Sequence, residues 1–228
     1  MVNGLDLRHS ALIIVDVQND FCHTDGTSAR MGLDVSAVQS VVPGIVTLIE
    51  LARAHGIQRI YLRGEHNRWF DSPTWVARGA AGQSIHAERV PYVRSGTWGA
   101  DFFVVEPTDE ELVIVKHRYS GFAFTPLELA LQTLGVETVL LCGTSTHVCV
   151  EATARDAIMR GYRPVIVSDC VASGQSHLHE AALIDMAQYV GPVVSLEEVR
   201  EAMEAASDPN RRADNSAHSS APAEWKRL

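Results

Sequence analysis

Short runs of consecutive apolar residues alternate along the chain with segments whose apolar residues recur every three or four positions. Unbroken apolar runs are typical of strands that are buried on both faces of a sheet, and the recurring spacing is typical of helices with one apolar face. This alternation predicts a mostly parallel sheet covered on both faces by helices. The runs are Ala11–Val15, Ile57–Leu62, Leu112–Val115, Thr138–Leu141, Pro164–Val167 and the short Val193–Val194.

Proline, glycine and capping residues set the helix boundaries that the pattern predicts. Pro43 is placed to open one helix and Gly56 to stop it. Thr125-Pro126-Leu127-Glu128 has the form of a capping box, and the helix that it begins ends at Gly135. Three further helices are predicted: one that begins near Cys149 and ends before Gly161, one over Ala181–Tyr189 and one over Leu196–Ala206.

Length and composition fit one domain. The chain has 228 residues, 46% of them hydrophobic, which is enough for one sizeable core. We expect an α/β domain over residues 1–206, with a single open six-stranded sheet of Rossmann-like type. Residues 64–111 are irregular and are expected to hold an excursion on the substrate side with a short helix. Residues 207–228 are polar, and we predict a flexible tail outside the core.

Charge and cysteine content narrow the functional classes. The formal net charge of −9 argues against a generic binder of nucleic acid or of anionic membranes. No apolar stretch approaches the length of a membrane span, and the first residues lack the pattern of a secretion signal. Four cysteines in such a chain suggest reduced thiols, so we expect a cytoplasmic protein. No cofactor is expected.

Three of the predicted strands are each followed by a side chain that can take part in catalysis. Asp16 follows the first strand, Lys116 follows the third, and Cys149 follows the fourth after a short polar loop. Ligands of open parallel sheets bind beyond the carboxyl ends of the strands, so these side chains are expected to share one site. Cys149 also lies where a helix begins, which favours the nucleophilic thiolate. Each residue alone has a structural explanation, but their strands are expected to be neighbours, and the coincidence favours catalysis.

The segments around these residues resemble the isochorismatase-like cysteine hydrolases, which include nicotinamidases, N-carbamoylsarcosine amidohydrolase and ureidoacrylate amidohydrolase. The resemblance covers roughly residues 10–195, nearly all of the predicted core. It implies the isochorismatase type of α/β fold and assembly as a homodimer or homotetramer. Its motifs lie, in the order of the family, at Leu12–Phe21, Lys116–Phe122 and Cys142–Ala157.

The resemblance also implies a mechanism. Asp16, Lys116 and Cys149 would form a catalytic triad that transfers an acyl group through a thioester. Asp16 would take the thiol proton and later activate water, while Lys116 holds the charges in place. The backbone N–H groups of Ser145 and Cys149 are the candidates for an oxyanion hole. In relatives the peptide bond that matches Thr144–Ser145 is cis, and the alternative here is an ordinary trans loop.

Five residues are candidates for binding the substrate. Gln18 shares the side of its strand with Asp16, and it either orients the substrate or Asp16, or caps a loop. Phe21 and Phe122 are placed to form an apolar wall, although isolated aromatics are more often core. Tyr119 matches a tyrosine that contacts substrate in the ureidoacrylate branch of the family. Glu65 either enters the pocket to bind N–H groups or is a surface charge among arginines.

Metal binding is not expected. Nicotinamidases bind a metal with an Asp-x-His and a later His at the place of Glu65-His66-Asn67, and this chain departs from that spacing. Cys142, His147, Cys149 and Cys170 offer another ligand set, but their spacing is not that of a zinc site.

We expect an amidohydrolase that cleaves a small amide, carbamoyl or ureido C–N bond and releases ammonia or an amine. A vinyl-ether hydrolase like isochorismatase is the rival enzyme, but its chemistry does not use a cysteine nucleophile. A degenerate scaffold for binding is the non-enzymatic alternative, and the retention of all three polar groups at the sheet edge weighs against it.

Overall fold

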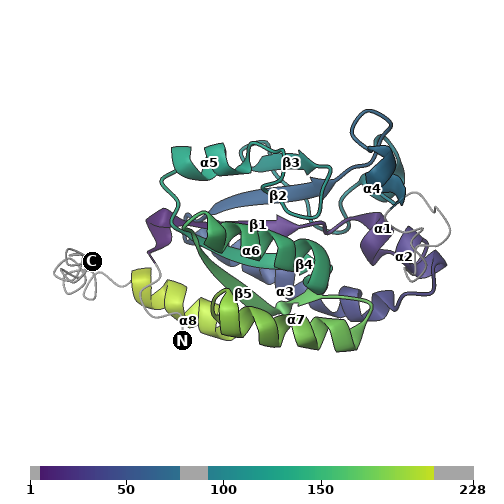
Figure 1. Ribbon diagram of the computed structural model, residues 1–228. Coiled ribbons are helices and arrows are strands. Elements are labelled where there is room, and N and C mark those ends of the chain that lie inside the picture. Colours follow the sequence, from purple (N-terminus) through teal and green to yellow (C-terminus); the bar gives the residue numbers. More distant parts are fainter. Residues whose placement is uncertain (1–5, 78–91, 208–228) are drawn as a thin grey trace.

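The computed structural model describes residues 6–77 and 92–207. Their strands form one parallel six-stranded sheet in the order β3-β2-β1-β4-β5-β6, which confirms the predicted fold class (Figure 1). The order reverses direction at β1, as in doubly wound sheets. The strands are β1 (Ser10–Val15), β2 (Gln58–Gly64), β3 (Leu112–Lys116), β4 (Thr138–Thr144), β5 (Arg163–Ala172) and β6 (Val193–Val194).

The α-helices of the described residues connect these strands or lie in the segments that follow them. They are α1 (Asn19–Cys22), α2 (Thr27–Arg30), α3 (Val35–Ala54), α4 (Pro73–Ala77), α5 (Leu127–Thr133), α6 (Glu151–Met159), α7 (Ser176–Tyr189) and α8 (Leu196–Ser207).

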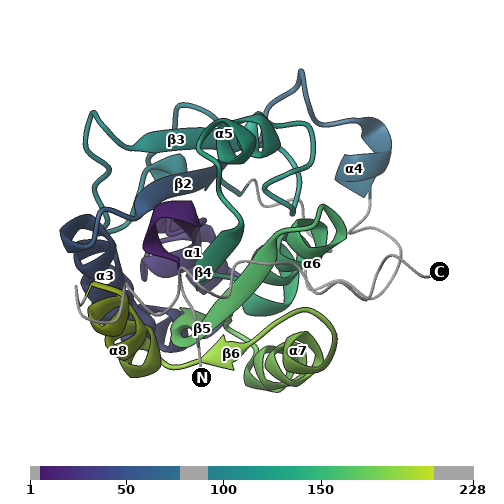
Figure 2. The same ribbon diagram turned by 90° about the vertical axis from the view of Figure 1, so that its left-hand side faces the viewer.

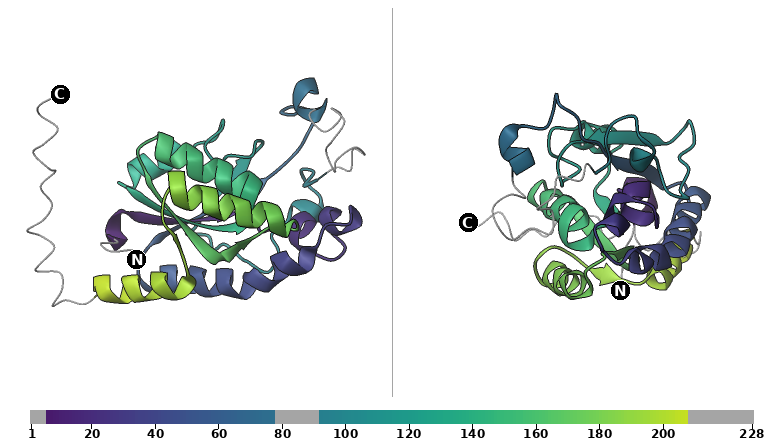
Figure 3. Two further views of the ribbon diagram at one scale, coloured as in Figure 1. Left: turned by 60° about the horizontal axis from the view of Figure 1, so that its bottom comes forward. Right: turned by 90° about the vertical axis from the view of Figure 1, so that its right-hand side faces the viewer.

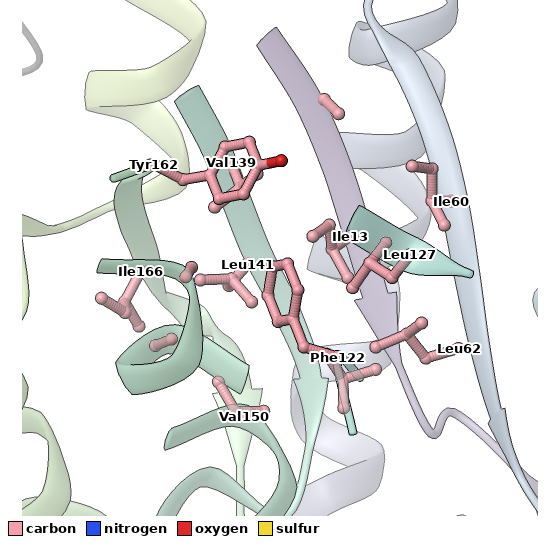
Figure 4. Packing of buried hydrophobic residues seen from close by; sticks show 14 of the residues in the cluster. Ile13, Ile60, Leu62, Phe122, Leu127, Val139, Leu141, Val150, Tyr162 and Ile166 are labelled. Atoms are coloured by element: carbon pink, nitrogen blue, oxygen red, sulfur yellow. The ribbon is translucent and has the colours of Figure 1, made fainter. Parts of the chain in front are cut away.

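Helices cover both faces of the sheet, and each face has its own apolar core. α3 and α8 pack on one face, where Leu12 and Ile14 of β1 point. α5, α6 and α7 pack on the other face, where Ile13 and Val15 point (Figure 2). Figure 4 shows this second core, with Phe122 lying among Leu62, Leu141 and neighbouring apolar side chains. Side chains of the same strand alternate between the two cores, as strand geometry requires.

α3 begins earlier than predicted. Asp34 accepts a hydrogen bond from the Ser36 N–H, so the helix starts at Val35 and continues through Pro43. The prediction that Pro43 opens this helix is wrong, because an aspartate cap nine residues upstream already starts it. The expectation that no apolar stretch approaches the length of a membrane span is wrong, because α3 is long and apolar enough to cross one. Seven of its residues are buried in the protein, as in a core helix of a globular domain.

Other boundaries differ by smaller amounts. α5 begins at Leu127, after Pro126, and Thr125 caps it by accepting from the Leu127 N–H at 3.2 Å. Glu128 forms an ion pair with Arg160, so it does not close the predicted capping box. α7 begins at Ser176, earlier than predicted.

The irregular segment before β3 contains the predicted short helix. It is α4, which stands out from the body of the domain (Figure 3). A 3-10 turn, Trp98–Ala100, follows later and returns to the site edge of the sheet, where Gln18 forms a bridge with Phe102. Of the predicted tail at 207–228, Ser207 is the last residue of α8, and residues 208–228 lie outside the described residues.

A buried ion-pair network fixes the start of β3. Glu111 accepts hydrogen bonds of 2.8 Å from Arg53 of α3 and from Arg59 of β2, and its side chain is fully buried. Burial alone raises the pKa of Glu111, but the hydrogen bonds from the two arginines lower it to about 2. The network therefore ties the helix, the second strand and the edge strand together at the end opposite the catalytic residues.

Candidate active site

The carboxyl ends of β1 and β3 carry the first two predicted catalytic residues. Asp16 directly follows β1 with a φ of 51°, in the left-handed region that aspartate tolerates better than most residues. Lys116 is the last residue of β3. The expectation that their strands are neighbours is wrong, because β2 lies between β1 and β3. The two side chains therefore have to meet across the end of β2.

Gly64, the last residue of β2, leaves the space in which they meet. It pairs with Lys116 in the parallel register, and a Cβ at Gly64 would lie 3.4 Å from Asp16 Oδ1. Lys116 Nζ lies 2.7 Å from Asp16 Oδ2 and donates a 3.0 Å hydrogen bond to the Arg118 carbonyl. The Lys116 and Asp16 side chains are 3% and 1% exposed, so the ion pair is shielded from water.

β4 delivers the third residue. Gly143 has a φ of 120°, and a Cβ there would collide with the Val15 carbonyl, so only glycine lets β4 approach β1 this closely. The chain then forms a π-helical turn, Thr146–Val150, that leads into α6 and contains Cys149. Turns of this kind often occur at functional sites. The prediction that the thiol stands at the start of a helix is confirmed.

Asp16 and Lys116 both lie close enough to the Cys149 thiol to shift its pKa, so the structure brings the three predicted catalytic residues together. Burial raises the pKa of Cys149 to about 12, the Lys116 charge lowers it, and the Asp16 charge raises it. For Lys116, burial lowers the pKa, but the charges of Asp16 and Cys149 outweigh burial and hold it above its usual value. The resting site thus holds a neutral thiol beside an ion pair. In this site, burial opposes the thiolate, which the helix terminus by itself favours.

The candidate oxyanion hole lies in the turn between β4 and α6. Ser145 follows β4 directly, and its carbonyl accepts from the N–H groups of Val148 and Val150 at 3.0 and 3.4 Å. The described residues contain no cis peptide bond, so Thr144–Ser145 has the trans form, unlike the bond in relatives. Thr144 Oγ1 donates to the Asp16 carbonyl at 2.8 Å and joins this turn to the end of β1. Oxyanion binding by Ser145 and Cys149 stays a prediction.

Gln18 is fully buried, and its amide bonds to backbone groups. Nε2 donates to the carbonyls of Gly64 and Ala100 at 3.0 and 2.7 Å, and Oε1 accepts from the Gly64 N–H at 2.8 Å. These bonds use both amide donors and one acceptor position. The structure therefore places Gln18 as an anchor between the end of β1, the end of β2 and the Trp98–Ala100 turn. Its predicted contact with substrate stays a prediction.

Phe21 stacks on Tyr92, with ring centroids 5.5 Å apart, and packs against the α3 core. The neighbouring Asp20 holds the same segment in place, because its Oδ2 accepts from the Val93 N–H at 2.6 Å. Val93 is buried at a φ of 38°, and its side chain lies 3.6 Å from the position that a Gly64 Cβ would take. Val93 thus borders the triad beside Asp16.

Glu65 follows β2 and forms an ion pair of 2.6 Å with Arg63. Tyr119 is 38% exposed and lies beside Trp75 of α4, with ring centroids 4.9 Å apart. Phe122 is 5% exposed within the core of the α5–α7 face, 5.8 Å from the Tyr162 ring (Figure 4). The structure thus places Tyr119 at the surface near α4 and Phe122 in the core.

The two ligand sets considered for a metal do not come together. Cys142 and Cys170 lie in the core under α3, whereas Cys149 lies in the core of the opposite face. His66 Nδ1 lies 2.9 Å from Asp71 Oδ1. Within the described part of the chain, no group of three potential metal ligands is placed to hold an ion.

Sequence reasoning missed Gly64, Asp20 and Val93. A glycine at the end of a strand is a signal for Gly64, because glycine in a strand often marks a place where other groups approach closely. Asp20 lies inside the quoted motif Leu12–Phe21, but its partner Val93 is distant in sequence, so nothing local points to the contact.

A thiol, a carboxylate and an ammonium group buried together at the carboxyl edge of a parallel sheet define a cysteine hydrolase of α/β fold. The isochorismatase domain model matches residues 10–198, and the chain belongs to the isochorismatase family.

Curated relatives include a ureidoacrylate amidohydrolase of Methylobacterium radiotolerans, 33% identical over 82% of this chain and 77% of that protein. Another, from an Enterobacter species, is 34% identical over 81% of this chain and 84% of that protein. Among solved structures, a nicotinamidase from Bacillus subtilis has a TM-score of 0.66 and 27% identity, covering 82% of this chain and 99% of its own.

A cysteine hydrolase from Pseudomonas syringae has a TM-score of 0.77 at 24% identity, covering 89% of this chain and 95% of its own, and it shares the fold. These comparisons identify this protein as an amidohydrolase that acts on non-peptide C–N bonds.

Proposed function

We propose that this amidohydrolase cleaves a small ureido or carbamoyl compound, with Cys149 as nucleophile, Asp16 as acid and base, and Lys116 as the fixed cation. One observation carries the mechanism: Lys116 Nζ lies 2.7 Å from Asp16 Oδ2, and the charges of both groups act on the buried Cys149 thiol beside them. The substrate class is supported by the names of the relatives, which are ureidoacrylate amidohydrolases at 33% and 34% identity.

The first step is a proton transfer inside the triad. Asp16 takes the thiol proton, and the sulfur of Cys149 adds to the carbonyl carbon of the substrate. The developing oxyanion is bound by the backbone N–H groups of Ser145 and Cys149. Lys116 keeps its proton, since its pKa lies above the usual value, and its charge stabilises the anionic sulfur.

The second half of the reaction reverses the roles. Asp16 gives its proton to the leaving nitrogen, the C–N bond breaks, and ammonia or an amine departs from the thioester. Asp16 then takes a proton from water as the water oxygen attacks the thioester carbon. The C–S bond breaks, the proton returns to the sulfur of Cys149, and the acid product leaves. No cofactor takes part in these steps.

An ammonia-release screen tests this proposal. The panel contains ureidoacrylate, biuret, N-carbamoyl amino acids, nicotinamide and simple amides, and we expect turnover of ureido or carbamoyl members. Cys149→Ser and Cys149→Ala should fold normally, with turnover lower by at least about 10³-fold, because the nucleophile is lost. Full activity of either variant would refute the nucleophile assignment.

The same screen separates the rival functions. Pyruvate release from isochorismate without ammonia release from any panel member would favour the vinyl-ether hydrolase. Turnover of nicotinamide alone would place the substrate among aromatic amides and contradict the ureido proposal. A folded protein that is inert toward the whole panel and toward isochorismate would support the binding scaffold.

We also propose a cytoplasmic location and assembly as a homodimer or homotetramer, with no nucleic-acid or membrane partner. The support for the location is the set of reduced, buried cysteines together with the family of the chain. Light scattering of the purified protein measures the assembly state directly, and a monomer at micromolar concentration would contradict this part of the proposal.

A further inference from the structure

Thr153 lies in the first turns of α6, and its hydroxyl joins two catalytic segments. Its side chain is fully buried. Thr153 Oγ1 donates to the Cys149 carbonyl at 2.7 Å and accepts from the Gly121 N–H at 3.0 Å. Cys149 carries the thiol, and Gly121 belongs to the loop that follows Lys116. One hydroxyl therefore connects the segment of the nucleophile to the segment of the cation.

The loop around Gly121 is held close to the sheet. A Cβ at Gly121 would collide with the Leu62 side chain of β2, so the loop has little freedom to move inward. The Gly121 N–H is also buried, and it donates its hydrogen bond to Thr153 Oγ1. A buried N–H without an acceptor is unfavourable, so the loop would move to find another partner if this hydroxyl were removed.

The geometry points to Thr153 as a positioning residue for the reaction. We propose that its hydroxyl sets the distance between the Cys149 thiol and the Lys116 ammonium group by fixing both backbone segments. This inference rests on the proposed role of Cys149 and Lys116. It follows that removing the hydroxyl weakens the contact through which Lys116 lowers the pKa of the thiol.

Two substitutions isolate the hydroxyl. Thr153→Val keeps the shape of the side chain and loses both hydrogen bonds, whereas Thr153→Ser keeps both bonds and loses a methyl group. Thr133 gives a matched control, because its Oγ1 donates to the carbonyl four residues earlier at 2.8 Å, on the exposed part of α5. Thr133→Val loses a bond of the same kind far from the triad.

The experiment measures alkylation of Cys149 by iodoacetamide as a function of pH, followed by peptide mass spectrometry. The other three cysteines are fully buried and serve as internal references. In Thr153→Val we expect Cys149 to be alkylated more slowly than in the wild type at every pH tested, while Thr153→Ser and Thr133→Val keep the wild-type rate. With a substrate found in the screen, kcat of Thr153→Val should fall by about 10- to 100-fold at unchanged KM.

A wild-type rate of Cys149 alkylation in Thr153→Val would overturn the inference, and so would a Thr153→Ser variant that is as impaired as Thr153→Val. If Thr153→Val does not fold, Thr153→Ala is judged by the same criteria, with circular dichroism as the test of folding. Alkylation needs no substrate. The inference can therefore fail while the amidohydrolase assignment stands, and failure of the substrate screen leaves the alkylation result interpretable.

Discussion

Replacing Asp16 and replacing Lys116 should shift the pKa of Cys149 in opposite directions. Burial raises that pKa to about 12, the Lys116 charge lowers it and the Asp16 charge raises it. Asp16→Asn removes the negative charge at nearly constant shape, so the anionic sulfur is left beside Lys116 alone. Lys116→Met removes the positive charge and leaves the sulfur beside Asp16. The first variant should lower the pKa and the second should raise it.

The size of the first shift follows from Coulomb's law. Two unit charges about 4 Å apart interact by about 4 kcal/mol at an effective dielectric constant of about 20. One pKa unit corresponds to about 1.4 kcal/mol, so loss of the Asp16 charge should lower the pKa of Cys149 by about 3 units. The thiol of Asp16→Asn should then titrate below the value of about 12 that burial and the Asp16 charge give the wild-type thiol.

The assay is a titration of ultraviolet thiolate absorbance, with Cys149→Ala subtracted to remove the other cysteines and the tyrosines. Asp16→Asn should gain thiolate at lower pH than the wild type and still have no turnover, because no group takes and returns the proton. Lys116→Met should show no thiolate in the accessible pH range. An unchanged or raised midpoint in Asp16→Asn would refute the electrostatic assignment of the triad.

Two predictions concern the scaffold. Glu111→Gln should lower the free energy of unfolding by about 3 kcal/mol at neutral pH, because Arg53 and Arg59 lower the Glu111 pKa from 4.5 to about 2. Urea titrations should show this difference shrinking as pH falls from about 4.5 towards 2, and a constant difference would contradict it. Gly64→Val should abolish turnover by filling the space between Lys116 and Asp16, whereas Gly64→Ala, whose Cβ makes ordinary contacts, should fold and keep activity. An active Gly64→Val would show that this space is not needed.

The apolar runs predicted the strands of the sheet well. A parallel strand that is covered on both faces buries all of its side chains, so it is apolar throughout. The runs at Ala11–Val15 and Thr138–Leu141 became the two central strands, with their ends extended by one to three residues. Helix starts were predicted less well. The sequence suggested that the helix starts at Pro43, but the Asp34 cap starts it at Val35. A proline is also tolerated inside a helix that can adapt to it.

Strand order was beyond the reach of the sequence pattern. Periodicity shows that a segment is a strand but not which strand lies beside it, so the position of β2 between Asp16 and Lys116 had no local signal. The pKa of Cys149 was missed for a related reason. The helix terminus is visible in the sequence. The burial of Cys149 depends on residues that precede and follow it at a distance in the sequence, so it is a property of the folded core.

A pKa of about 12 for Cys149 is compatible with nucleophilic catalysis because the two processes differ in where the proton goes. Titration sends the proton to bulk water and leaves two negative groups, Asp16 and the sulfur, around one ammonium group in a buried site. Transfer from Cys149 to Asp16 keeps the net charge of the triad at zero and moves the negative charge by one hydrogen bond. Burial therefore strongly opposes the loss of the thiol proton to bulk water, and it only weakly opposes the transfer of that proton to Asp16. It follows that the raised pKa of the Cys149 thiol does not argue against the proposed transfer of its proton to Asp16.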